Sequence, residues 1–206
     1  MKKLLYYWNE SPWYFTIRFI VLFTLLYGGF QFFIGIAAPG GTIHSAFMEQ
    51  YVNLVQYYTN LLVNSVIEAA KLFDISAYPF GLSGIRTLGK GGVNVGFDCL
   101  GIGVISIWLA YVVAHQLRTK SKLLWSIGGV LILYILNVAR ITLLVASVEF
   151  HWTDWKKLGL DHHTLYNIVS YIAMFFMAWI FVVTGVKAKD EAEIEDEIKD
   201  EAKVKG

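Results

Sequence analysis

The chain has 206 residues, of which 56% are hydrophobic and 16% are charged, and its formal net charge at pH 7 is +1. A soluble domain carries about a quarter charged residues, so this composition excludes an ordinary soluble domain, and the sequence contains no basic stripe of the kind that binds nucleic acid. The single cysteine excludes an intramolecular disulfide and a cysteine-rich metal site.

Four apolar segments predict membrane-spanning helices, since a span needs roughly 20 apolar residues. They are residues 19–38, 100–114 with an extension towards residue 117, 123–150 and 164–186. The first segment is longer than the apolar core of a cleavable signal peptide, which runs about 7–15 residues. We therefore expect it to be a signal anchor.

Between the first two segments, residues 47–73 predict an amphipathic helix, because their polar residues recur in steps of three or four. These are Glu49, Asn53, Gln56, Asn60, Asn64, Glu68 and Lys71. The helix is expected to lie at the outer membrane surface or beside the bundle; the alternative is a polar-lined fifth span. Basic residues near span ends favour the cytoplasm, and four spans place the N-terminus, the 115–122 loop and the C-terminal flank there together.

The segment 74–98 is rich in glycine and leads directly to Cys99. Within it, the β-prone runs 85–88 and 93–95 flank a glycine-rich turn, which predicts either a hairpin or an irregular loop. The expected fold is therefore an all-α membrane protein with about four transmembrane helices, an outer amphipathic helix and a short loop or hairpin before Cys99. Residues 1–186 form one membrane-embedded domain, and 187–206 a charged cytoplasmic tail.

Two residues inside or beside the spans stand out chemically. Cys99 lies where an outer loop enters a span, and a helix N-terminus favours a thiolate, although the adjacent Asp98 opposes it. The alternative is that Cys99 is a small buried hydrophobe. Arg140 is a charge inside a long apolar helix, where charges are costly and usually functional. Asn137 shares its face. The alternative is a structural arginine paired with a main-chain carbonyl or with Glu149.

A histidine pair, His162 and His163, lies at the outer mouth of the last span, with Asn167 about one turn later. An imidazole can act as a general base or acid near neutral pH, and Asn167 could orient it. Adjacent helical residues point about 100° apart, so the pair does not predict a metal site. A cysteine, a base and an oxyanion donor are together the set that acyl transfer requires.

These residues resemble a known family. Cys99-Leu-Gly101 at the start of a span, Asn137-Val-Ala-Arg140 in the next and His163 before the last look like the exosortase/archaeosortase family, over about half the chain. The resemblance implies a membrane-embedded cysteine transpeptidase without a metal or cofactor. By it, Cys99 is the nucleophile, Arg140 stabilises the transition state, His163 is the general acid/base, and Asn137 supports them; His162 stays an alternative base.

The resemblance also implies the substrate and the location. The substrate is a secreted protein with a C-terminal motif, a transmembrane helix and a basic tail, and the product is passed to a surface anchor, with a lipid or a glycan as candidate acceptor. The enzyme would be a multi-pass protein of the cell membrane, with cytoplasmic termini and an extracytoplasmic active site. Two alternatives stay open: a protease that ends in hydrolysis, and a non-catalytic membrane scaffold or transport accessory.

Overall fold

The computed structural model describes residues 12–37, 45, 47, 50, 53–88, 91–115, 119–150 and 168–184. The elements, in chain order, are α2 (Pro12–Ala37), α4 (Leu54–Ala70), the 3-10 turn η1 (Lys71–Phe73), β1 (Ala77–Phe80), β2 (Gly84–Thr87), β3 (Gly91–Asn94), the 3-10 turn η2 (Phe97–Leu100), α5 (Ile102–Ala114), α6 (Thr119–Glu149) and a last helix, Ile168–Thr184. The chain is mostly helical, as expected of an all-α membrane protein, but it also contains a small three-stranded sheet.

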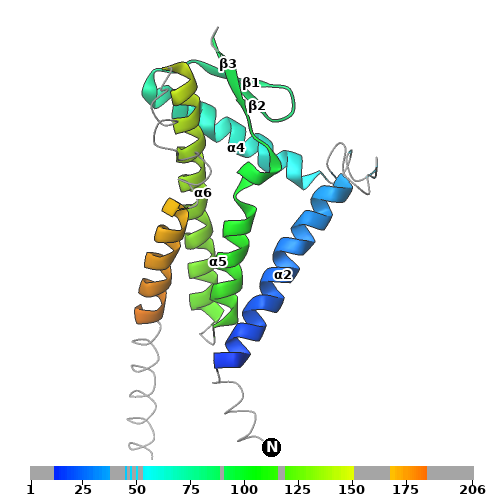
Figure 1. Ribbon diagram of the computed structural model, residues 1–206, viewed down its shortest axis with the longest axis vertical. Coiled ribbons are helices and arrows are strands. Elements are labelled where there is room, and N and C mark those ends of the chain that lie inside the picture. Colours follow the sequence, from blue (N-terminus) through cyan, green and yellow to red (C-terminus); the bar gives the residue numbers. More distant parts are fainter. Residues whose placement is uncertain are drawn as a thin grey trace, which may run out of the picture.

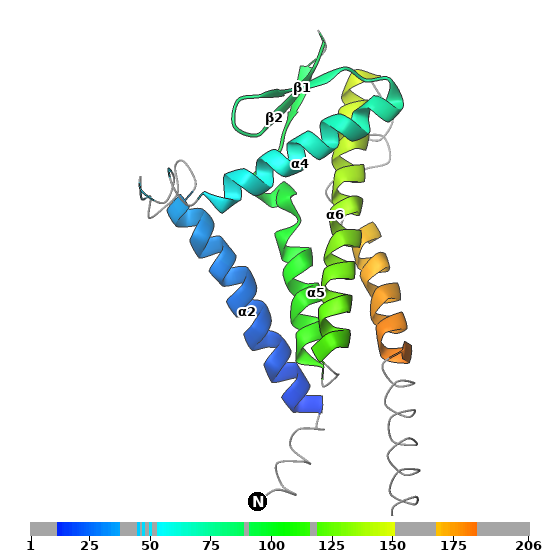
Figure 2. The same cartoon turned by 180° about the vertical axis from the view of Figure 1, so that it is seen from behind.

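The long helices run lengthwise, and the remaining elements cap one end of them. In Figures 1 and 2, α2, α5, α6 and the last helix extend along the long axis, whereas α4 crosses over one end and the three strands lie beyond α4. We call this the sheet end, formed by residues 54–100. The opposite end is the basic end. There Lys122 Nζ donates to the Val113 carbonyl oxygen at 3.2 Å, close to Arg18.

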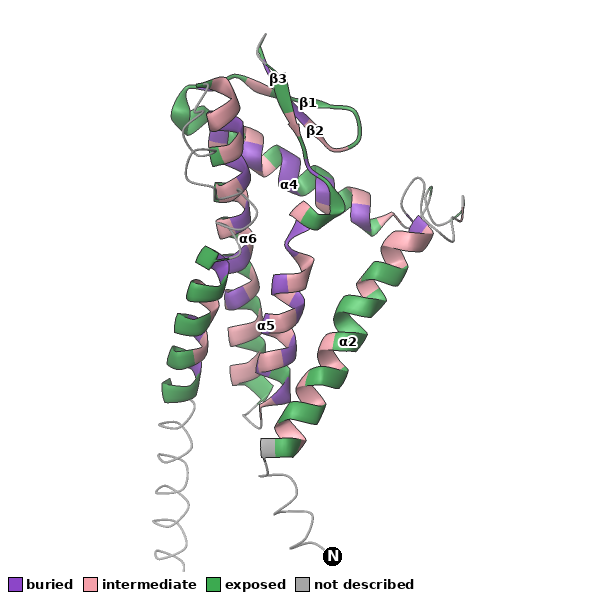
Figure 3. Cartoon of the chain, viewed as in Figure 1, coloured by how far each residue is buried: buried purple, intermediate pink, exposed green. Residues whose placement is uncertain are grey.

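Much of the helical surface is apolar and exposed. Two helices, Trp13–Ala37 and Thr119–Glu149, are long and apolar enough to span a membrane, and α5 and the last helix are shorter apolar helices. Leu25 on α2 is 65% exposed and Phe175 on the last helix is 72% exposed, and both helices are largely green in Figure 3. A soluble monomer rarely leaves so extended an apolar surface in water, so these helices support membrane association.

The amphipathic helix predicted over residues 47–73 is present as α4 and η1. It begins after Asn53, whose side chain accepts a hydrogen bond from the Gln56 amide at 2.9 Å and so caps the helix. One face of α4 is buried under the sheet and against α6, through Val55, Leu62, Val63, Val66 and Ala70. The polar stripe lies on another face, where Asn60, Asn64 and Glu68 are exposed.

The strands form an antiparallel sheet in the order β1-β2-β3. Of the hairpin and the irregular loop expected before Cys99, the structure has the hairpin: β2 pairs with β3 from Thr87 opposite Gly91 to Gly84 opposite Asn94. The structure adds β1, which the sequence did not predict, in register with β2 from Ala77 opposite Thr87. Ile85 and Thr87 are buried on the inner face, which packs on α4 and α6.

A second core joins α5, α6 and the last helix. Trp108 on α5 is 1% exposed and lies edge-on to Phe181, with ring centroids 6.4 Å apart. Its indole Nε1 donates to the Trp125 carbonyl oxygen at 3.1 Å. Gly129 lies against the same indole, and a methyl group there would overlap the ring. This glycine therefore allows α5 and α6 to pack closely.

Candidate functional site

Cys99 lies in a tight turn between the sheet and α5. It is the third residue of η2, and its amide donates to the Gly96 carbonyl oxygen at 2.9 Å. Gly101 then adopts a left-handed conformation with φ of 74°, which glycine reaches without strain, and α5 begins at Ile102. The helix therefore starts two residues later than expected, so Cys99 precedes the first turn of α5 instead of opening it.

The main chain at Cys99 is held from α6. The Asn137 side chain donates from Nδ2 to the Cys99 carbonyl oxygen at 2.9 Å, and Arg140 donates from Nη2 to the same oxygen at 3.4 Å. Asn137 and Arg140 are three residues apart and so share one helical face. The structure thus brings together three of the residues singled out from the sequence, across 38 and 41 residues of chain.

These two donors differ in the length of their hydrogen bonds, in their burial and in the hydrogen-bonding groups that each carries besides. The 2.9 Å bond from Asn137 has ordinary length, whereas 3.4 Å is long for an N–H···O bond. Asn137 is 1% exposed, and within the described chain its Oδ1 has no hydrogen-bond partner. Arg140 is half-buried and carries five N–H donors in a planar fork. The contact also agrees with the alternative of a structural arginine paired with a main-chain carbonyl.

The helix α4 holds the next carbonyl, which the sequence did not predict. The Tyr58 hydroxyl donates to the Leu100 carbonyl oxygen at 3.2 Å, and its ring lies edge-on to Tyr134 of α6, 6.2 Å between centroids. Tyr134 in turn lies 2.8 Å from the Ser65 hydroxyl. Consecutive carbonyls at the turn are therefore held by side chains from two different helices, which fixes the peptide planes around Cys99.

The histidines predicted as general acid or base, His162 and His163, and the supporting Asn167 lie outside the described residues. The last helix is described from Ile168, five residues after His163. It packs against α5 and α6 through Met177 and Phe181. In Figure 1, the start of this helix lies beside α6, part-way along its length, and is the end of the helix that is nearer to the sheet.

In the part of the chain that the structure describes, no cluster of three histidine, cysteine or acidic side chains could hold a metal ion. Comparison with protein-family models, with curated proteins and with solved structures gives no match to this chain.

Proposed function

We propose that this protein is a membrane-embedded cysteine transpeptidase of the exosortase/archaeosortase type, with Cys99 as its nucleophile. The observation that carries the proposal is the convergence of Asn137 and Arg140 on the Cys99 main chain. An intramembrane arginine beside the sole cysteine is costly to keep in an apolar helix unless it has a role. Acyl transfer supplies such a role.

In this proposal the four lengthwise helices span the membrane, and the sheet end faces outwards. Support comes from the apolar surface of α2 and the last helix and from the basic residues gathered at the other end, among them Arg18, Lys120 and Lys122. Basic residues favour the cytoplasmic side. Helix α5 has 13 residues, about 20 Å at 1.5 Å per residue, so η2 and Cys99 would lie within protein near the outer boundary.

The first half of the reaction breaks the peptide bond of the substrate. The Cys99 thiolate attacks the carbonyl carbon, a carbon–sulfur bond forms, and the carbonyl oxygen becomes an oxyanion. Arg140 stabilises that charge in a site of low dielectric, where such donors are most effective. The tetrahedral intermediate then expels the amine, which takes its proton from the His163 imidazolium, and a thioester on Cys99 remains.

The second half transfers the acyl group. His163 removes the proton from a hydroxyl or amine of the acceptor, the acceptor attacks the thioester, and the carbon–sulfur bond breaks to return the thiolate. His162 is the alternative base. The acceptor is a surface anchor of lipid or glycan type; water in its place would make the enzyme a protease. The mass of the released product distinguishes the two outcomes.

Labelling with a membrane-impermeant maleimide in intact cells tests both the side and the accessibility of this thiol. We expect Cys99 to be labelled from outside, because it lies at the sheet end and is half-buried. The rate of labelling should change in Asn137→Ala, because the turn loses its 2.9 Å hydrogen bond from Asn137. Inverted vesicles supply the control for sidedness. Labelling only in inverted vesicles would contradict the topology, and an inert thiol would favour the non-catalytic scaffold.

A further inference from the structure

We propose that the free edge of β3 binds the substrate as an added β-strand, so that main-chain hydrogen bonds to Gly92 and Asn94 deliver the scissile bond to Cys99. The occupant is the extended segment that directly precedes the membrane helix of the substrate. This inference rests on the proposed function and deepens it, because it states how the substrate is recognised.

The register of the sheet determines which groups are free at that edge. The Val95 amide donates to the Ser83 carbonyl oxygen at 3.0 Å, so this opposed pair is hydrogen-bonded. Bonded and non-bonded pairs alternate along an antiparallel ladder. Val93 and Gly91 therefore also face β2, whereas the amides and carbonyls of Gly92 and Asn94 face away from it. No second strand pairs with β3 among the described residues.

The opposite edge of the sheet, formed by β1, does not suit an added strand in the same way. By the alternation, Arg86 opposite Tyr78 is a bonded pair, so the nitrogen of Pro79 faces away from β2. Proline has no N–H to offer, and prolines at this position are a common means of blocking an edge strand. Helix α4 also lies against β1, as Figure 2 shows. Helix α6 likewise contacts β3, so the missing N–H of Pro79 is what distinguishes the two edges. Among the described residues, Gly92 and Asn94 are exposed and pair with no further strand.

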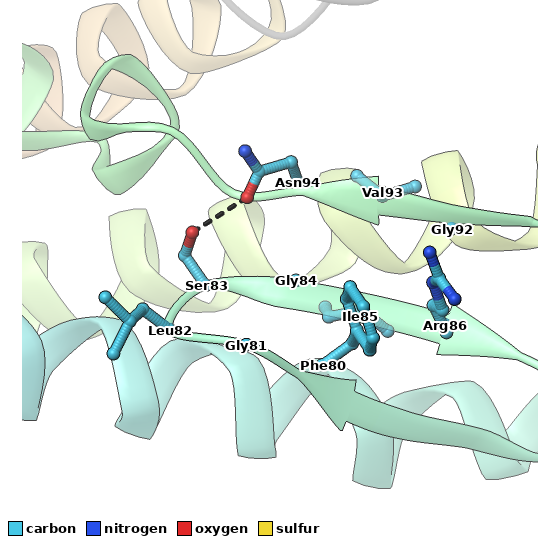
Figure 4. A pocket seen from close by; sticks show the side chains of 10 residues that line it. All are labelled: Phe80, Gly81, Leu82, Ser83, Gly84, Ile85, Arg86, Gly92, Val93 and Asn94. Carbon is cyan, nitrogen blue, oxygen red and sulfur yellow. Dashed lines mark hydrogen bonds between the residues drawn. The ribbon is translucent and has the colours of Figure 1, made fainter.

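The face next to the β3 edge can receive alternate side chains of an added strand. A shallow hollow of about 430 Å³ lies over β1, β2 and β3 (Figure 4), with the Arg86 guanidinium 3.7 Å above the Phe80 ring. Gly84 and Gly92 line its floor without side chains. A Cβ at either position would press on a main-chain carbonyl oxygen, that of Phe80 or that of Ile85 respectively. Every second side chain of the added strand would lie on the same face of the sheet as this hollow, beside it.

The position of the edge relative to the thiol fits a single extended segment. Asn94 precedes Cys99 by five residues, a path of at most about 18 Å even when fully extended. A substrate strand beside β3 would therefore need only about five residues between its contact with Asn94 and its scissile bond. Its membrane helix would continue from there alongside the bundle.

The test uses the full-length chain in membranes and, as substrate, the uncleaved precursor of the polypeptide that is recovered as a thioester on Cys99. Asn94→Pro removes the outward N–H without removing a ladder bond, and Asn94→Ala removes only the side chain, which accepts from Ser83. We expect kcat/KM for Asn94→Pro to be about tenfold below that of Asn94→Ala, as loss of one main-chain hydrogen bond predicts. Ala77→Pro, on the β1 edge, is the matched control and should retain wild-type kcat/KM.

Amide exchange on a complex of Cys99→Ala with the same uncleaved precursor gives a second measurement that does not depend on proline. Protection should increase at the amides of Gly92 and Asn94, whereas Val93 and Val95 are protected with or without it. Bound polypeptide with unchanged exchange at Gly92 and Asn94, or equal kcat/KM for the two Asn94 variants, would overturn strand addition. Absence of any polypeptide on Cys99 would instead contradict the proposed function.

Discussion

Cys99→Ala is expected to leave the substrate polypeptide uncleaved in the membrane while the protein stays folded. Removal of a catalytic nucleophile lowers the rate on the order of a thousandfold or more, and this chain has no second cysteine to replace it. The measurement is the ratio of precursor to product on immunoblots of cells that express the variant with its natural substrate. Cys99 is half-buried beside the core, so loss of its sulfur should change packing only slightly.

Cys99→Ser provides the control for shape, because it keeps the size of the side chain and the main-chain bonds of the turn. It should also accumulate precursor, since a serine hydroxyl ionises far less readily than a thiol. Both variants should retain the wild-type melting temperature in detergent to within a few degrees. Processing by Cys99→Ala at the wild-type rate would show that Cys99 is not the nucleophile.

Arg140→Lys is expected to lower kcat roughly a hundredfold, the usual effect of losing an oxyanion donor. Lysine keeps the positive charge but not the planar fork. Its ammonium could replace the 3.4 Å contact with the Cys99 carbonyl and would then have no donor held in fixed geometry for the substrate. The measurement is the rate of product formation in reconstituted membranes at saturating substrate.

Arg18→Lys makes the same exchange at the basic end, where Arg18 lies over the Tyr14 ring with 5.3 Å to its centroid. This variant should process substrate at the wild-type rate. Full activity in Arg140→Lys would reduce Arg140 to a structural counter-charge for the η2 turn. That result would favour the alternative in which the arginine merely satisfies a carbonyl.

The long helices could be predicted from the sequence because lipid solubility requires apolar runs of a certain length. The residues at which these helices begin and end could not be predicted, because hydropathy contains no information about hydrogen bonding. Helix α2 is described from Pro12, seven residues before the predicted apolar run, because Arg18 does not interrupt the backbone ladder. Helix α5 begins late because Gly101 takes a left-handed conformation.

The sheet and the site were predictable only in part. Two β-prone runs around glycines predicted the hairpin, but β1 contains Pro79, which argues against a strand unless it lies at an edge. The spacing of Asn137 and Arg140 predicted a shared face. Their contact with Cys99, and that of Tyr58 with Leu100, join residues about 40 positions apart, and no periodicity in a single sequence encodes such pairings.

The most direct test of the central claim is the mass of the wild-type chain isolated from cells that contain its substrate, after rapid denaturation in acid. We expect a fraction of the chain to carry a polypeptide joined to Cys99, which hydroxylamine releases and which is absent from Cys99→Ala. A wild-type chain that carries no such adduct while product continues to form would contradict covalent catalysis by Cys99.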